Sequence, residues 1–172
     1  MSIPTPNFDM VMNEMASQLS RQLQVNLLMK YKFAPGFTNK GTIYGMAPKV
    51  ASSALIDSIS VTYNAGSKSL EVEMLDYWKY VNDGRLPGKY APLSSILSWI
   101  TQKGLKGRDK KGRFITKESF AWGINTNIKK FGIAPTFFAD NAEAKVAQEF
   151  EERIGEALNQ DYENYFSSII GQ

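Results

Sequence analysis

Hydrophobic residues recur every three or four positions in four stretches of the chain, a spacing that places their side chains on one face of an α-helix. These stretches predict helices over residues 7–30, 93–103, 116–131 and 141–170. We expect Asn7 to cap the first helix, because its short polar side chain can accept a backbone hydrogen bond there. The pattern therefore predicts a largely helical chain with long helices at both ends.

Local signals mark the ends of the two central helices. Ser94 or Ser95 is expected near the cap of the helix at 93–103. Gly132 directly follows the helix at 116–131, in the position where glycine commonly ends a helix.

Apolar and polar residues alternate strictly in two neighbouring runs, which is the pattern of a half-buried strand. The apolar members of the runs are Ile59, Val61, Tyr63, Leu70, Val72 and Met74. The turn-like sequence Asn64–Ser67 separates the runs. We predict a β-hairpin at about residues 58–75 with one apolar face.

Together these elements predict an α+β fold, in which long N- and C-terminal helices pack on a small antiparallel sheet. The length of 172 residues and the hydrophobic content of 43% are ordinary for one globular domain. We expect residues 1–172 to form a single domain that carries a helical basic insertion at 86–131, made of two helices and a basic loop.

The apolar stripe of the last helix advances by four residues at every step. Its members are Ala142, Val146, Phe150, Ile154 and Leu158. Each step rotates the stripe by about 40°, since 3.6 residues make a turn. Either Gly155 permits a bend in this helix, or a second apolar face meets a partner.

Two groups of aromatic and aliphatic residues are candidates for a subunit interface. Tyr165, Phe166 and Ile169 make the end of the last helix unusually apolar for a chain terminus. Phe33, Phe37 and Tyr44 lie in a glycine-containing segment that reads as a long loop or arm. The alternative for the first group is that it docks on the core of its own chain.

Charge is unevenly distributed along the chain, whose net charge is +3. Residues 1–78 carry six basic and six acidic side chains, residues 79–132 twelve and three, and residues 133–172 two and eight. A basic middle followed by an acidic end fits a nucleic-acid face, a head-to-tail contact between copies, or two solvated faces of one domain.

The basic middle is concentrated in one glycine-containing loop. Its members are Lys103, Lys106, Arg108, Lys110, Lys111, Arg113 and Lys117. Asp109 and Gly112 occupy the first and last positions of a predicted β-turn in it. Contact with nucleic-acid phosphates, contact with the acidic last helix of another copy, and a solvated loop all remain open.

The composition argues against most enzyme classes. There is no cysteine and no histidine, which excludes thiol nucleophiles, thiolate metal sites and histidine-based acid–base chemistry. No phosphate-binding glycine loop, dinucleotide fingerprint or serine-hydrolase elbow is present. A carboxylate site for a divalent metal is the remaining alternative. We expect a non-enzyme without a cofactor.

Three further aromatic residues, Tyr77, Trp78 and Tyr80, follow the predicted hairpin. They are expected in the core, the alternative being a platform on which bases stack. The N-terminus lacks the pattern of a signal peptide, and no stretch of 18 apolar residues predicts a membrane span, so we expect no membrane contact and a cytoplasmic chain.

The order of these pieces resembles the tail-completion or head–tail joining (neck) proteins of tailed bacteriophages. In that family a Gly-x-Leu-x-x-Ser-Ile stretch enters a strand, a Tyr-Ala-x-x-Val-Glu-x-Gly-Thr stretch leaves the second strand, and a Pro-Phe-x-x-Pro-Ala stretch precedes the final helix. The matching residues here are Leu55, Ser58, Ile59, Tyr77, Val81, Gly84, Pro135, Phe137 or Phe138, and Ala142. Trp78, Asn82 and Arg85 depart from the pattern, and residues 86–130 have no counterpart in short members of the family.

The resemblance implies a structural virion protein that is assembled in the host cytoplasm. Its copies would form a homo-oligomeric ring around the DNA channel, next to portal, connector or tail proteins, and the basic loop would contact an acidic neighbour. A small nucleic-acid-binding protein that uses residues 103–117 is the alternative.

Overall fold

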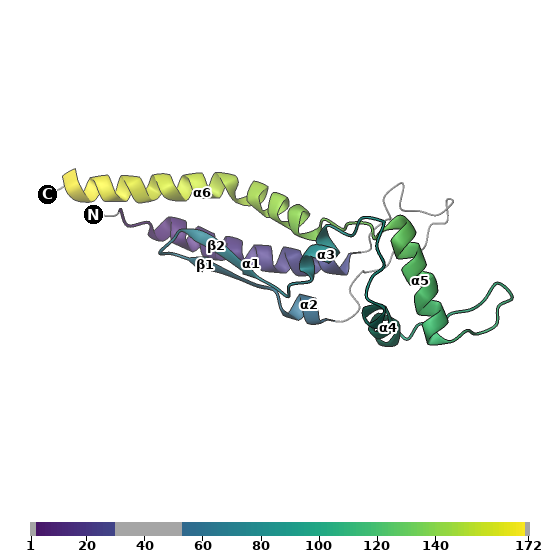
Figure 1. The fold of residues 1–172 in the computed structure, drawn as a ribbon. Coiled ribbons are helices and arrows are strands. Elements are labelled where there is room, and N and C mark those ends of the chain that lie inside the picture. Colours follow the sequence, from purple (N-terminus) through teal and green to yellow (C-terminus); the bar gives the residue numbers. More distant parts are fainter. Residues whose placement is uncertain (1–2, 30–52, 171–172) are drawn as a thin grey trace. The chain divides into compact units, whose positions relative to one another are not determined.

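The structure, a computed structural model, describes residues 3–29 and 53–170 (Figure 1). It has the predicted α+β fold, with long helices at both ends of the chain and one two-stranded antiparallel sheet. The elements are α1 (Pro6–Leu28), α2 (Ala54–Asp57), β1 (Ser60–Asn64), β2 (Ser69–Glu73), α3 (Trp78–Asn82), α4 (Leu93–Gln102), α5 (Lys117–Phe131) and α6 (Phe138–Ile170).

The chain divides into two compact units. The terminal unit consists of Met1–Leu27, Leu55–Leu75 and Phe138–Gln172, and the central unit consists of Leu28–Ala54 and Asp76–Phe137. The expected insertion at 86–131, with its two helices and basic loop, falls inside the central unit.

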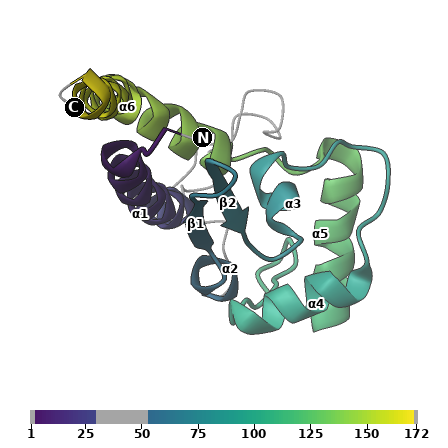
Figure 2. The same ribbon diagram turned by 90° about the vertical axis from the view of Figure 1, so that its left-hand side faces the viewer.

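Helices α1 and α6 form the core of the terminal unit and run antiparallel, side by side (Figure 2). Their buried apolar residues are Val11, Met12, Ala16, Leu19, Leu23 and Leu27 on α1, and Phe138, Ala142, Val146, Phe150 and Ala157 on α6. Burial of each larger side chain contributes about 1.5–3 kcal/mol. The predicted apolar stripe of α1 is therefore the face that holds the last helix.

The buried amides of Gln22 and Asn26, between these helices, both have hydrogen-bond partners, one of which is the exposed Lys145. Lys145 donates to the Gln22 side-chain oxygen at 3.0 Å, and Gln22 donates to Asn26 at 2.8 Å. Asn26 in turn donates to the backbone oxygen of Phe138 at 2.9 Å, in the first turn of α6. Because a buried amide without a partner would destabilise the core, this chain of contacts selects one register between the helices.

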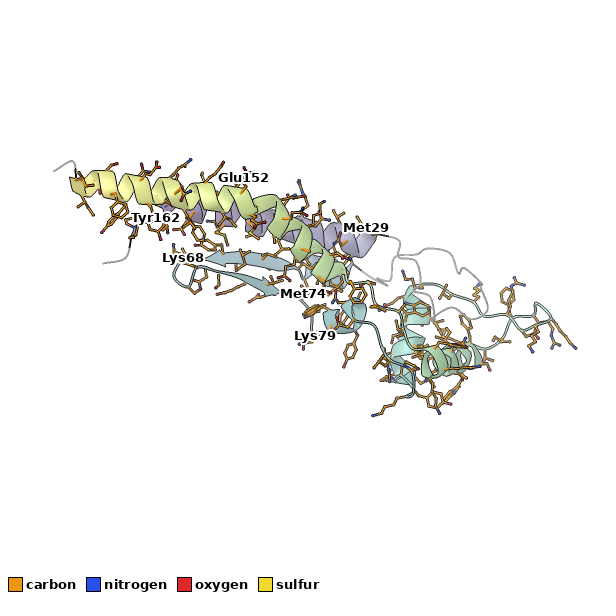
Figure 3. The ribbon with its side chains drawn as sticks, turned by 90° about the horizontal axis from the view of Figure 1, so that it is seen from above. Met29, Lys68, Met74, Lys79, Glu152 and Tyr162 are labelled. Atoms are coloured by element: carbon orange, nitrogen blue, oxygen red, sulfur yellow. The ribbon has the colours of Figure 1, made fainter. Side chains whose placement is uncertain are left out.

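The hairpin packs against the first turns of α1. Val61 pairs with Val72 and Tyr63 with Leu70, so the alternation predicted from the sequence places these residues on one face. The rings of Phe8 and Tyr63 meet edge to face with centroids 6.2 Å apart. Lys68, at the hairpin turn, is labelled in Figure 3.

The prediction that Asn7 caps the first helix is wrong. The helix begins one residue earlier, at Pro6, and the carbonyl of Thr5 accepts the first helical hydrogen bond, from Asp9. Proline suits this position because its missing N–H is not needed there. The side chain that caps the first turn comes from α6 instead: the buried carboxylate of Asp161 accepts from the backbone N–H groups of Asn7 and Phe8.

The apolar stripe of α6 also differs from the prediction in its second half. Ile154 and Leu158 are half-buried, whereas Ala157 and Asp161 are buried. A step of three residues, from 154 to 157, replaces a step of four and turns the buried face back toward α1. Figure 1 shows that α6 also bends part-way along its length.

A second apolar cluster lies between α4 and α5 in the central unit. Ile96, Ile100 and Ala121 are buried there. The amide of Asn125, also buried, accepts from the backbone N–H of Ala91 at 2.8 Å and donates to its carbonyl at 3.0 Å. This pair of bonds holds the segment before α4 against α5.

For the two longer helices of the central unit, the predicted end of α5 is confirmed and the predicted cap of α4 is wrong. Thr116 caps α5 by accepting from Ser119, and Gly132 ends the helix with a φ of 73°. The expected cap at Ser94 or Ser95 is wrong, since Pro92 precedes α4 and makes no side-chain cap.

Two close backbone contacts connect the beginning and the end of the stretch Asp76–Phe137 of the central unit. Arg85 and Ile133 exchange two N–H···O bonds of 2.8 Å. A side chain on Gly84 or Gly132 would meet backbone oxygen at 2.2 Å, so both positions require glycine. The backbone N–H groups of 136 and 137 then donate to the carbonyl of Asn82, just before α6 begins.

Candidate functional site

The basic loop, residues 103–117, joins α4 to α5 and extends away from them (Figure 1). The predicted turn is confirmed: the N–H of Gly112 donates to the carbonyl of Asp109 at 3.0 Å. A bridge between Arg108 and Phe114 closes the base of this turn. Residues 108–114 thus form a small hairpin, called here the loop tip.

Asp109 organises the loop tip through its carboxylate. It accepts from the backbone N–H groups of Lys111 and Arg113 at 2.8 and 2.9 Å, and from the Arg113 side chain at 2.9 Å. These bonds lower the pKa of the Asp109 carboxyl, the backbone N–H of Arg113 being the largest cause. The one acidic residue of the loop therefore shapes the turn.

The cations of the loop have different surroundings. The Arg108 guanidinium lies 4.0 Å from the ring centroid of Phe114 and donates to the carbonyl of Gly112. Lys117 donates to Thr101 at 3.2 Å, which places it at the base of the loop beside α4. The loop tip brings together Arg108, Lys110, Lys111 and Arg113; Lys103 and Lys117 lie at its base, and Lys106 lies between.

Lys106, Lys110 and Lys111 are exposed, and their ammonium groups make no hydrogen bond or ion pair with any residue that the structure describes. Phe114 is exposed over 62% of its surface although it is apolar. The loop tip therefore presents a cationic surface with an aromatic ring at its edge. Such a surface suits an anionic partner that also offers apolar contact.

The end of α6 is the second candidate surface. Because Asp161 caps the start of α1, residues 162–170 extend about 13 Å past the first turn of that helix, at 1.5 Å per residue (Figure 1). We call these residues the overhang. Phe166 and Ile169 are each 54% exposed there, whereas Tyr165 is half-buried on the side that also carries Pro4 and Pro6.

The exposed side of the overhang combines apolar and acidic groups. Tyr162, Glu163, Phe166 and Ile170 line one shallow depression on it. Two residues of the predicted interface set, Phe166 and Ile169, thus lie on an exposed face, and Tyr165 does not. Phe33, Phe37 and Tyr44, the other predicted members, lie outside the described residues.

Opposite charges are segregated between the two units. The terminal unit carries four basic and thirteen acidic side chains, a net charge of −9. The stretch Asp76–Phe137 of the central unit carries twelve basic and four acidic side chains, a net charge of +8. The chain therefore presents one acidic and one basic body, a division that the linear charge pattern indicated only roughly.

One exposed aromatic cluster was not foreseen. Tyr90 and Trp122 meet edge to face at 5.9 Å, and the Lys129 ammonium lies 4.4 Å from the Tyr90 centroid. Trp122 falls outside the apolar stripe of α5, which consists of Phe120, Ile124, Ile128 and Phe131, and this position was the available signal for its exposure. Asn125 positions the cluster, because it holds Ala91, the residue after Tyr90.

The expectation that the aromatic residues after the hairpin lie in the core is wrong. Tyr77 and Tyr80 are exposed, and Trp78 is half-buried. The helix that carries two of them, α3, is five residues long, so it has too little buried face to cover all three rings.

Neither a metal-binding cluster nor a membrane-spanning helix is found in the described residues, 3–29 and 53–170. No group of three or more acidic residues there is placed to hold a metal ion. No helix in the same ranges is long and apolar enough to cross a membrane.

Comparison of the chain with known protein families, with curated proteins and with solved structures finds no match in any of the three.

Proposed function

We propose that this protein is a structural component of the head–tail connector of a tailed bacteriophage, acting as a neck or tail-completion protein whose copies assemble around the DNA channel. The observation that carries the proposal is that one chain contains both an acidic body and a basic body. The acidic body also carries the exposed apolar overhang. Two different, complementary surfaces suit head-to-tail contacts, which close into a ring when the rotation between copies allows.

The residues on which the family resemblance rests support the proposal through their place in the fold. Leu55, Ile59, Phe138 and Ala142 are buried in the terminal unit, and Gly84 lies where a side chain would strike backbone. They are framework positions rather than members of a chemical site. A resemblance of this kind fits a family whose members serve as structural parts.

The proposed partners are other copies of this chain and the neighbouring portal, connector or tail proteins, in a virion that is assembled in the host cytoplasm. Quantitative mass spectrometry of purified phage particles tests this. We expect a fixed copy number on the order of 6 to 12 per particle, as a closed ring requires. Absence from particles, with the protein present in infected cells, would overturn the proposal.

A second candidate function, binding of nucleic acid through residues 103–117, is favoured by one observation. The loop tip places the Arg108–Phe114 pair beside the exposed ammonium groups of Lys110 and Lys111. Binding through these cations would weaken steeply as salt is raised, because it releases counterions from phosphates. If Lys110→Glu, Lys111→Glu and Arg113→Glu together leave DNA binding unchanged, this function is excluded.

A further inference from the structure

Three surfaces of the described chain have no assigned partner: the overhang of α6, the loop tip, and the Tyr90–Trp122–Lys129 cluster. The cluster combines two rings and one cation, and neither its charge nor its shape singles out one occupant. The overhang and the loop tip are complementary to each other in charge and both carry exposed apolar groups. We infer that the overhang of one copy binds the loop tip of a second copy, and that this contact joins copies head to tail.

The first argument is the apolar surface that the fold leaves uncovered on the overhang. Asp161 sets the register of α6 against α1, and the helix then continues for residues 162–170. Tyr162, Phe166 and Ile169 expose about half of their surfaces there. Exposed aromatic and aliphatic side chains gathered on one helix face are typical of a surface that binds another protein.

The second argument is charge. The overhang depression includes Glu163, and Glu156 is exposed about two turns earlier on the same helix. The loop tip offers the ammonium groups of Lys110 and Lys111, which make no hydrogen bond or ion pair in the part of the chain that the structure describes. Opposite charges at the edge of an apolar contact steer association and reject wrongly oriented partners.

The third argument is that the loop tip also supplies apolar surface and is ordered before binding. Phe114 is largely exposed beneath the Arg108 guanidinium, and the Lys110 and Lys111 stems add aliphatic surface. The hydrogen bonds of Asp109 hold the turn in its shape. A preformed hairpin loses less conformational freedom on binding than a flexible loop would.

This inference rests on the assembly function proposed above and names the contact that would produce it. It predicts a test by complementation, because the two surfaces are different and each copy carries both. One variant combines Phe166→Ser with Ile169→Ser and keeps its loop tip. The other combines Lys110→Glu with Lys111→Glu and keeps its overhang.

Sedimentation velocity of the full chain at low salt provides the readout. We expect the wild type to form oligomers that dissociate as salt is raised, and each variant alone to be monomeric. An equimolar mixture of the two variants should form 1:1 dimers and nothing larger, since one intact surface remains on each partner. Native mass spectrometry with one variant labelled with nitrogen-15 identifies the mixed dimer.

Matched controls separate this contact from general effects of the substitutions. Met10→Ser removes a side chain of α1 that is 57% exposed, in the same unit as the overhang. Lys129→Glu with Lys130→Glu makes the same charge change as the loop variant, in the same unit as the loop. Both controls should assemble like the wild type, and thermal unfolding of all variants verifies that they are folded.

The inference is overturned if the wild type stays monomeric, if the mixed variants fail to form dimers, or if the controls lose assembly to the same extent. It is also overturned if the loop variant assembles normally but no longer binds a DNA oligonucleotide, which would assign the loop tip to nucleic acid. Particle mass spectrometry reports separately on the proposed function: presence in particles together with failed complementation would retain the connector function and remove this contact.

Discussion

Asp161, near the end of α6, accepts hydrogen bonds from the backbone N–H and the side-chain amide of Asn7, in the first turn of α1, at 3.1 and 2.8 Å. The other carboxylate oxygen accepts from the N–H of Phe8 at 2.9 Å. The first turn of a helix has N–H groups without helical partners and carries partial positive charge, so a carboxylate stabilises it. Here that carboxylate belongs to a residue 154 positions after Asn7 in the sequence.

Replacement of this carboxylate should destabilise the terminal unit. Asp161→Ala leaves the N–H groups of Asn7 and Phe8 without an acceptor in a site where Asp161 is only 2% exposed. Loss of a cap costs about 0.5–2 kcal/mol, and unsatisfied buried donors add to it, so we expect the free energy of unfolding to fall by about 2–4 kcal/mol. Urea unfolding followed by circular dichroism measures this. Glu152→Ala, on the exposed side of α6, is the control and should change stability by less than about 0.5 kcal/mol; equal effects of the two substitutions would contradict the capping role.

The same contact shows why part of the fold could be predicted from sequence and part could not. The helix predicted at 116–131 is observed at 117–131, because Gly132 and a regular apolar spacing are local signals. Local spacing also predicted the hairpin and its apolar face. The cap of α1 depends on how two distant helices align, and no local pattern distinguishes Asp161 from the acidic residues around it.

The candidate surfaces, too, could be predicted from the sequence only in part. Asp109 and Gly112 predicted the turn of the loop tip, because a turn depends on four adjacent residues. Apolar character alone did not separate Phe166, which is exposed, from Tyr165, which lies on the side of Pro4 and Pro6. That difference follows from the position at which α1 begins, which is a tertiary relationship.

The contact of Asp9 with Lys68 and Tyr63 should make stability depend on pH in the acid range. The pKa of the Asp9 carboxyl is lowered, chiefly by the hydrogen bond from Lys68 at 2.6 Å and next by that from the Tyr63 hydroxyl. A lowered folded-state pKa means that the stabilisation is fully present above the unfolded-chain value of about 3.9 and is lost as pH falls through the folded-state value.

A comparison of the wild type with Asp9→Asn by thermal unfolding between pH 2 and 7 tests this dependence. The wild type should melt at a higher temperature near neutral pH, and the difference should shrink as the carboxyl is protonated. Tyr63→Phe keeps the ring that contacts Phe8 but removes the hydroxyl donor. In the Tyr63→Phe background, the difference in melting temperature between the protein with Asp9 and its Asp9→Asn variant should therefore be smaller. A difference that stays constant down to pH 2 would show that the Asp9 contact contributes no pH-dependent stability.

The amide of Asn125 should be required for the central unit. Asn125→Ala removes both hydrogen bonds to Ala91 and leaves a buried space between α5 and the segment before α4. We expect the free energy of unfolding to fall by about 2–4 kcal/mol, because two hydrogen bonds are lost and the backbone N–H and carbonyl of Ala91 are left without these partners. Asn127→Ala, an exposed change on the same helix, is the matched control and should have little effect. Unfolding of the central unit can be followed by tryptophan fluorescence; a loss no larger than that of the control would contradict a structural role for the amide.

Substitution of glycine by alanine should have very different effects at two positions with positive φ. Gly132 has φ of 73°, and a Cβ there would lie 2.2 Å from the backbone oxygen of Arg85. Gly104 has φ of 62°, but a Cβ there would meet nothing within 4 Å. Gly104→Ala should therefore cost only the backbone term of about 1–2 kcal/mol. Gly132→Ala adds a collision with backbone that cannot move without breaking the paired N–H···O bonds of Arg85 and Ile133, so we expect it to unfold the central unit or to cost more than about 3 kcal/mol. Thermal unfolding of both variants measures the two losses of stability. Equal losses would mean that the backbone at Gly132 does not approach the backbone of Arg85 as closely as the structure has it.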